Sequence, residues 1–224
     1  SLNISPNNYI VLHVRETSYF GDDNRKMNKE ADINNYIEAL NYLEELNLPV
    51  VRMGDPKVAE FSHNNLINYC KSEFYSPQND IVLSGNARFA MINCSGYRYL
   101  PYILGIPTLT VNAFPYGGTD LSKNSAVLFK KIKKNGSYLS LNESIGLYYV
   151  SDEEYEKRNI MIEENSGEEI LQATKSFLDY LNQGHSKNII DMADTFRKKI
   201  NSSEFDIGFI RSDSYVNMIR FNQE

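Results

Sequence analysis

The sequence has few of the residues from which disulfide frameworks, metal centres and membrane spans are built. Its 224 residues include two cysteines, Cys70 and Cys94, and three histidines that are scattered along the chain. Two cysteines give neither a disulfide framework nor a zinc-site spacing, and isolated histidines indicate no metal site. Apolar stretches such as residues 10–12 are far shorter than the roughly 20 residues of a membrane span, and no signal peptide is visible. We therefore expect a cytoplasmic protein that needs no metal ion or cofactor.

The chain also lacks an excess of positive charge. Its formal net charge is −6 and its pI is about 5.2, whereas nucleic-acid-binding proteins carry clustered lysine and arginine residues that neutralise phosphates. We therefore expect no nucleic-acid partner. One basic segment, residues 130–134, could dock an anionic membrane surface or an acceptor phosphate, which would place the protein at the inner face of the membrane. The alternative, favoured by the acidic composition around this segment, is a solvated basic face.

Three common motifs of nucleotide-binding and hydrolytic enzymes are absent. The sequence has no Gly-x-Gly-x-x-Gly run after an apolar strand, no Gly-x-x-x-x-Gly-Lys-Ser/Thr run and no Gly-x-Ser-x-Gly run. These absences argue against a dinucleotide-dependent dehydrogenase, a P-loop enzyme and a serine hydrolase.

Apolar, β-branched runs alternate with amphipathic helical patterns up to about residue 113. This alternation predicts right-handed βαβ units and an α/β, Rossmann-like parallel sheet with helices on both faces. Asp32 is expected to cap the first helix and Asp80 to open the second. We expect one domain over residues 1–185 and a C-terminal helical extension over residues 186–224 that packs on it. The expected strands cover residues 9–14, 49–55, 66–70, 88–93 and 107–112, and the expected helices cover residues 32–46, 80–87, 97–104, 168–181 and 186–200.

Polar residues follow the expected strands, and the carboxyl ends of parallel strands meet at one crevice where ligands bind. Arg15 is the sharpest candidate, because a guanidinium at a strand end can grip a pyrophosphate with two hydrogen bonds and neutralise a departing nucleoside diphosphate. The alternative is a salt bridge from Arg15 to Glu16 or Asp55. The candidate residues at strand ends are Arg15, Glu16, Arg52, Gly54, Asp55, Ser95, Gly96 and Asn112.

Other polar positions have competing interpretations. Ser95 and Gly96 offer a hydroxyl, backbone amides and room for a phosphate at a helix start, but a plain strand-to-helix turn explains them too. His13 lies inside an apolar strand and is interpreted as a core residue. Asp22 and Asp23 resemble half of an acidic metal motif, although loop acids of this kind usually face solvent.

Several short motifs, taken in their order, resemble a family of bacterial glycosyltransferases with the GT-B architecture. The resemblance covers about residues 9–182 and implies the nucleotide-sugar-binding, C-terminal half of such an enzyme, of the kind associated with surface polysaccharide or lipopolysaccharide synthesis. The His-Val-Arg run is also similar to that of GDP-fucose-dependent fucosyltransferases, which implies a donor-phosphate role for Arg15. The motifs are Val-Leu-His-Val-Arg-Glu at residues 11–16, Ala-Asp-Ile-Asn-Asn-Tyr at 31–36, Val-Arg-Met-Gly-Asp-Pro at 51–56, Ser95 and Gly96 with Pro101, and Gly-Ile-Pro at 105–107.

Two positions depart from the family pattern. Cys94 stands where a hydroxyl residue is common, and Ala113 stands before Phe114 where an aromatic residue is common. A GT-B enzyme also needs a second domain for its acceptor, and we expect this N-terminal acceptor domain to be missing from the chain.

The function expected from the resemblance is transfer of a sugar from a nucleotide-sugar to a glycan or lipid-linked acceptor. Arg15 and Arg52 would stabilise the diphosphate leaving group, and Glu16 would serve in acid–base work or sugar contact. The other expected donor-binding residues are Gly54, Asp55, Ser95, Gly96 and Asn112. Two alternatives stay open: another nucleotide-sugar enzyme, such as a hydrolysing epimerase, and a non-catalytic ligand-binding domain.

Overall fold

The main element of the fold is a six-stranded parallel sheet with the strand order β3-β2-β1-β4-β5-β6. The structure is a computed structural model that describes residues 2–16, 28–114, 125–144, 147 and 152–183. Each neighbouring pair in this sheet is parallel, which confirms the predicted Rossmann-like α/β fold. The strands are β1 (Ile10–His13), β2 (Val50–Arg52), β3 (Leu66–Ile67), β4 (Phe89–Ile92), β5 (Thr108–Ala113) and β6 (Ser125–Phe129).

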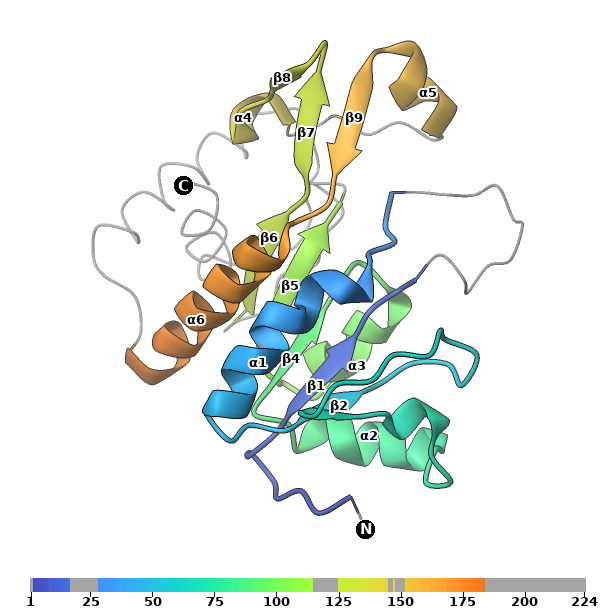
Figure 1. The fold of residues 1–224 in the computed structure, drawn as a ribbon, viewed down its shortest axis with the longest axis vertical. Coiled ribbons are helices and arrows are strands. Elements are labelled where there is room, and N and C mark those ends of the chain that lie inside the picture. The colour runs from blue at the N-terminus through green and yellow to red at the C-terminus, as the bar shows by residue number, and fades with distance from the viewer. Residues whose placement is uncertain (1, 17–27, 115–124, 145–146, 148–151, 184–224) are drawn as a thin grey trace.

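Helices cover both faces of this sheet (Figure 1), so alternate residues of a strand enter different cores. Ile10 and Leu12 pack into the core under α1 and α6, whereas Tyr9 and Val11 pack into the core that includes Leu83 of α2. Burial on both faces explains why the strand sequences are almost continuously apolar. The helical elements are η2 (Ile33–Tyr36), α1 (Ile37–Glu45), η3 (Tyr69–Lys71), α2 (Pro77–Gly85), η4 (Gly96–Arg98), α3 (Tyr99–Ile103) and α6 (Gly167–Gln183).

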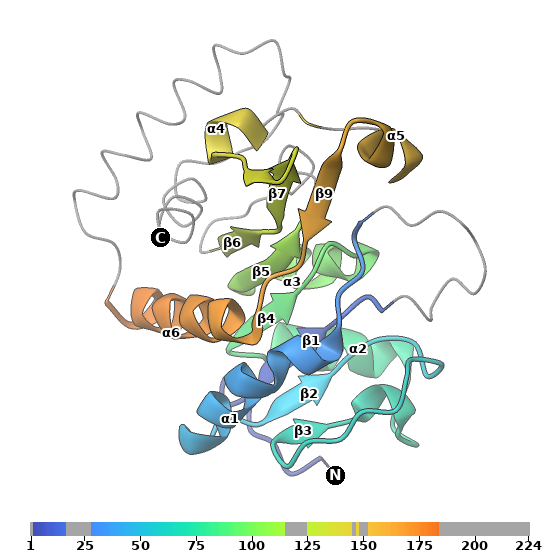
Figure 2. The ribbon, with the colours of Figure 1, turned by 45° about the horizontal axis from the view of Figure 1, so that its top comes forward.

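The long helix α6 returns to the sheet beside α1, as Figures 1 and 2 show, although the two are far apart in sequence. Its start and end lie close to the predicted range of residues 168–181. Phe177 of α6 is fully buried and meets the ring of Phe89 on β4 edge-on, at a centroid distance of 5.4 Å. The predicted cap of the first helix is also confirmed, because the Asp32 side chain accepts a hydrogen bond from the Asn34 amide.

A second, antiparallel sheet with the order β8-β7-β9 was not predicted from the sequence. It extends beyond the end of the parallel sheet (Figure 1). The expectation of a solvated basic face is wrong for Lys130, which is buried and donates from Nζ to the Glu30 carbonyl oxygen at 2.6 Å. The elements of this part are β7 (Lys131–Lys134), β8 (Ser137–Tyr138), α4 (Leu141–Ser144), α5 (Asp152–Lys157) and β9 (Ile160–Glu163).

Some predicted boundaries are wrong. The second helix begins at Pro77 and not at Asp80, because the Ser76 hydroxyl caps it by accepting a hydrogen bond from the Asn79 amide. The strand expected over residues 66–70 ends at Ile67. It is followed by the short helix η3, in which Tyr69 and Cys70 are buried. Strand β6 was not predicted.

Other expectations lie outside the described residues. They include the extension over residues 186–224 with its helix over residues 186–200, and the acids Asp22 and Asp23. Among the helices that the structure does describe, none is long and apolar enough to cross a membrane.

The docking of α6 on the sheet can be tested with Phe177→Ala. We expect this change to lower the free energy of unfolding by about 3–5 kcal/mol, because it leaves a cavity against Phe89. Urea denaturation measures the loss. Phe74→Ala is the matched control, because this side chain is 40% exposed, and a similar loss in both variants would contradict the proposed packing.

Candidate functional site

A cleft of about 210 Å³ opens at the carboxyl ends of β1 and β4. These neighbouring strands lead to opposite halves of the sheet, and such a reversal of strand order is where α/β proteins bind ligands. We call it the switch-point cleft. It brings together four of the predicted site residues, Arg15, Glu16, Ser95 and Gly96. Its lining consists of His13 at the end of β1, Val14, Arg15 and Glu16 after β1, Val58 after β2, and Ser95, Gly96 and Tyr97 after β4.

Arg15 is positioned through its backbone by Asn93, a buried residue that sequence reasoning missed. The Arg15 amide donates to Asn93 Oδ1 at 2.9 Å, and Asn93 Nδ2 donates to the Arg15 carbonyl oxygen at 3.3 Å. Asn93 Nδ2 also donates to the carbonyl oxygen of Lys29 at 3.2 Å. The only signal for this role in the sequence is one asparagine at the end of an apolar strand.

The Arg15 side chain forms a salt bridge, but with a partner that the sequence did not indicate. Its Nη2 lies 3.4 Å from Glu30 Oε1, and both side chains are mostly buried. A guanidinium carries five N–H donors in a fixed planar arrangement, which suits it to bind an anion. The geometry therefore combines a fixed backbone, a cation and an adjoining cleft.

His13 lies on the wall of the cleft, whereas the sequence pattern indicated a core residue. Its ring stacks on Tyr97 at a centroid distance of 4.7 Å, and its Nδ1 lies 3.1 Å from Ser95 Oγ. Gly54, at φ 139°, passes close to the same ring, since a Cβ there would lie 3.8 Å from it. Burial, with a smaller effect from the positive charges of Arg52 and Arg15, lowers the His13 pKa to about 4. The imidazole is thus neutral near pH 7.

The segment after β4 is open on the side of the cleft. A Cβ at Gly96 would meet no atom within 4 Å, so the backbone there can be approached closely. The expected helix is divided into η4 and the five-residue α3, which leaves little helix dipole to attract an anion. The Cys94 thiol accepts a hydrogen bond from the Phe114 amide at 3.3 Å and is not part of the cleft lining. The departure at Cys94 therefore removes no donor from the cleft wall.

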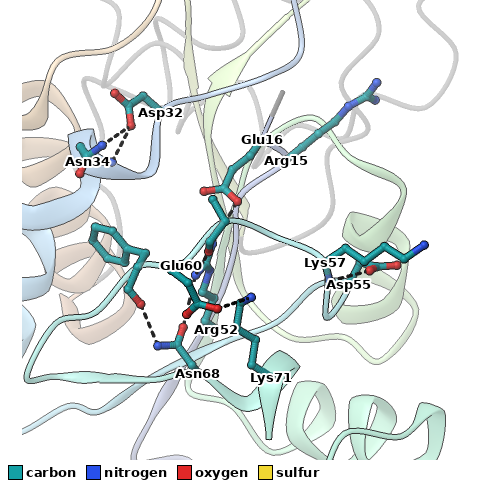
Figure 3. A network of polar contacts seen from close by, with 12 residues as sticks. Arg15, Glu16, Asp32, Asn34, Arg52, Asp55, Lys57, Glu60, Asn68 and Lys71 are labelled. Carbon is teal, nitrogen blue, oxygen red and sulfur yellow. Dashed lines mark hydrogen bonds and ion pairs between the residues drawn. The ribbon is translucent and has the colours of Figure 1, made fainter. Parts of the chain in front are cut away.

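Arg52 lies behind Glu16 and is almost completely buried, with 2% of its surface exposed. Its Nη2 donates to Glu16 Oε2 at 3.0 Å, and its Nη1 donates to the Ala59 carbonyl oxygen at 3.0 Å and to Asn68 Oδ1 at 3.3 Å. Figure 3 shows these contacts, with the Arg15 side chain pointing away from them. Arg52 is not among the residues that line the cleft.

The remaining predicted residues make contacts within the protein. Asp55 Oδ1 accepts a hydrogen bond from the Lys57 amide at 2.8 Å, as in a turn. Asn112, buried at φ 53°, exchanges hydrogen bonds with Asn165: each side-chain oxygen accepts from the other residue's amide, at 2.6 and 2.7 Å. This pair fixes the end of β5 to the chain that leaves β9. Roles of Asp55, Asn112 and Gly54 in donor binding stay predictions.

The described residues include no group of three or more histidine, cysteine, aspartate or glutamate side chains that could hold a metal ion. Asp22 and Asp23 lie in the part of the chain that the structure does not describe. The absence of a metal requirement therefore stays a prediction.

No family model and no curated protein matches the sequence. Among solved structures, the chain is similar to E. coli heptosyltransferase WaaC with ADP, at 17% identity and a TM-score of 0.40, over 68% of this chain and 45% of that chain. It is also similar to the iron-containing dodecameric glycosyltransferase TibC from enterotoxigenic E. coli, at 14% identity and a TM-score of 0.48, over 82% of this chain and 49% of that chain. The chain thus spans less than half the length of these proteins. Similarities at this level assign no function.

The burial of His13 has a consequence for stability that acid titration can test. Its pKa falls from 6.5 to about 4 on folding, so the unfolded chain binds the proton first. The stability that comes from the neutral His13 is therefore fully present above about pH 6.5. It is lost as the pH falls towards 4, and the loss is at most about 3 kcal/mol. Urea denaturation of the wild type and of His13→Asn over this range measures the difference.

Tyr97→Phe is the control for this titration, because it keeps the stacked ring and removes only the hydroxyl that lies 2.6 Å from Ser84 Oγ. We expect Tyr97→Phe to lose as much stability on acidification as the wild type does. We expect His13→Asn to lose less, because the part of the loss that comes from His13 is then absent. The same pH dependence in the wild type and in His13→Asn would show that His13 is not held neutral by the fold.

Proposed function

We propose that this chain is the nucleotide-sugar-binding half of a GT-B glycosyltransferase and that the donor diphosphate binds in the switch-point cleft. The observation that carries the proposal is the position of this cleft, with Arg15 on its wall, at the point where the strand order of the sheet reverses. Nucleotide ligands of doubly wound sheets bind at this place. The similarity of the His-Val-Arg run to that of fucosyltransferases is consistent with the same assignment.

Arg15 would contact the diphosphate and stabilise the negative charge that develops on the leaving group. Asn93 already holds the Arg15 backbone, which suits this role because the backbone needs little reorganisation when the charge appears. The Ser95 hydroxyl and the open backbone at Gly96 would provide further polar contacts. The neutral His13 would keep the Ser95 hydroxyl oriented.

The size of the cleft limits what it would hold. Its volume of about 210 Å³ is below the roughly 300–1,000 Å³ of pockets that enclose a drug-sized ligand. The diphosphate and one attached ring would fit there, and the rest of the donor would extend past the described lining.

The acceptor, a glycan or a lipid-linked sugar, would be bound by a second, N-terminal domain, as the GT-B resemblance implies. A cytoplasmic location, expected from the cysteine content, is part of the same proposal. Ion pairs within the protein oppose a membrane contact through residues 130–134, because Lys131 pairs with Glu169 at 3.0 Å and Lys133 with Glu163 at 2.9 Å.

Donor binding can be tested by a thermal-shift panel of ADP-, GDP-, UDP-, CMP- and dTDP-linked sugars. We expect one nucleotide class to stabilise the chain, by about 2.7 kcal/mol at a hundred times its dissociation constant. With that nucleotide, Arg15→Ala should weaken binding about ten- to a hundredfold in calorimetry, because a charge-assisted hydrogen bond contributes roughly 1.5–3 kcal/mol.

Arg88→Ala is the matched control for this measurement. Arg88 precedes β4 at the end of the sheet opposite to the cleft, and its Nη2 donates a hydrogen bond to Asn182 Oδ1. Its loss should therefore leave the affinity unchanged. No shift with any nucleotide sugar, or equal affinities for the wild type and Arg15→Ala, would contradict the proposal.

We also expect binding to be independent of divalent metal ions. A chelator should change the affinity for the nucleoside diphosphate by no more than about twofold, because protein cations and amides would carry the phosphate charge. Calorimetry with and without EDTA measures this. A strict requirement for magnesium or manganese would contradict the expectation and direct attention to Asp22 and Asp23.

A further inference from the structure

The switch-point cleft contains a carboxylate as well as a cation. Glu16 lines the cleft, and only 8% of its surface is exposed. Its Oε2 accepts a hydrogen bond from Arg52 Nη2 at 3.0 Å. In the part of the chain that the structure describes, Oε1 of Glu16 has no hydrogen-bond donor. One oxygen of the carboxylate is thus paired with Arg52, and the other has no partner among the described residues.

Arg52, which binds this carboxylate, is itself held by further hydrogen bonds. Asn68 Oδ1 and the Ala59 carbonyl oxygen bind the second guanidinium nitrogen, and the Asn68 amide in turn donates to the Phe61 carbonyl oxygen at 2.8 Å (Figure 3). Among the described residues, Glu16 is the only carboxylate within ion-pair distance of Arg52. The orientation of Glu16 is therefore set by a buried hydrogen-bond network that includes Arg52, the last residue of β2.

Stability alone is a weak explanation for this pair. A buried ion pair is often no more stabilising than apolar side chains of similar volume, because both charges lose their hydration. The pair also brings a negative charge to the wall of a cleft whose cation would bind an anion, and like charges repel. A carboxylate oxygen has a clear use there only if the ligand brings hydrogen-bond donors.

We propose that Glu16 recognises hydroxyl groups beside the bound anion and that Arg52 is its positioning residue. The pair would make the cleft select a phosphate that carries a hydroxyl-bearing ring over inorganic phosphate or pyrophosphate. Hydroxyls of this kind occur both in the ribose of a nucleotide and in a transferred sugar. The inference rests on the proposed function, because it takes the switch-point cleft as the anion site.

The test compares three probes that differ in the group attached to phosphate: inorganic pyrophosphate, ribose 5-phosphate and glucose 1-phosphate. Dissociation constants are measured for the wild type and Glu16→Gln by calorimetry or by NMR titration. We expect Glu16→Gln to bind pyrophosphate as tightly as the wild type or more tightly, and to bind at least one sugar phosphate about fivefold or more weakly. The sugar phosphate that is weakened identifies the ring that Glu16 contacts.

Glu60→Gln is the matched control, because Glu60 is also an ion-paired carboxylate, 2.8 Å from Lys71 Nζ, but its side chain is 86% exposed and outside the cleft. It should leave all three constants unchanged. Equal effects of Glu16→Gln on all three probes, or no effect on any, would overturn the role of Glu16.

Glu16→Gln leaves the Arg52 charge uncompensated and could unfold the protein. A second variant therefore tests the same role without leaving a buried charge unpaired. Glu16→Gln combined with Arg52→Met removes both charges and keeps the volume filled. We expect it to lose the preference for sugar phosphates to the same extent as Glu16→Gln, and Arg52→Met alone to lose much of it while still binding pyrophosphate. A further loss of sugar preference when Arg52→Met is added to Glu16→Gln would overturn the positioning role.

The outcomes separate this inference from the proposed function. A wild-type protein that binds none of the three probes would overturn the anion site, and both proposals with it. A wild type that binds pyrophosphate through Arg15 but shows the same constants with and without Glu16 would overturn only the inference about hydroxyl recognition.

Discussion

The parallel pairing of β1 with β4 is the constraint on which the rest of the structure depends. From this pair the chain builds outward in both directions, to β2 and β3 on one side and to β5 and β6 on the other. The connections that follow β1 and β4 therefore diverge, and a cleft remains where the two carboxyl ends meet. Asn93 ties the two ends together across this point, because it is the residue after β4 and bonds the backbone of Arg15 after β1.

Much of the fold could be predicted because its elements have strong local patterns. The central strands β1 and β4 are buried on both faces and so are almost continuously apolar, and α6 has a clear apolar face that includes Phe177. The smaller sheet could not be predicted in the same way. Strand β7 has lysines on both sides of one buried residue, Ile132, and its pairing with β9 depends on residues about thirty positions later, as in Lys131 with Glu163. Such a strand is stabilised by distant contacts that leave little local signal.

The site was predictable to the extent that strand ends converge. That rule brought Arg15, Glu16, Ser95 and Gly96 into one cleft, but it cannot tell which way a polar side chain faces. Arg52 ends β2 and points into a buried network. Likewise, His13 was assigned to the core because its neighbours are apolar, while its ring forms part of the cleft wall. Both outcomes depend on partners, Glu16 and Tyr97, that spacing in the sequence does not reveal.

The central claim, that the switch-point cleft is the donor site, is tested most directly by mapping backbone amide shifts in a labelled sample as a nucleotide sugar is added. The account predicts that the largest changes cluster at residues 13–16 and 95–97, the two segments that form most of the cleft lining. A saturable set of changes elsewhere, for example around Tyr102 and Thr108, with these two segments unaffected, would contradict it.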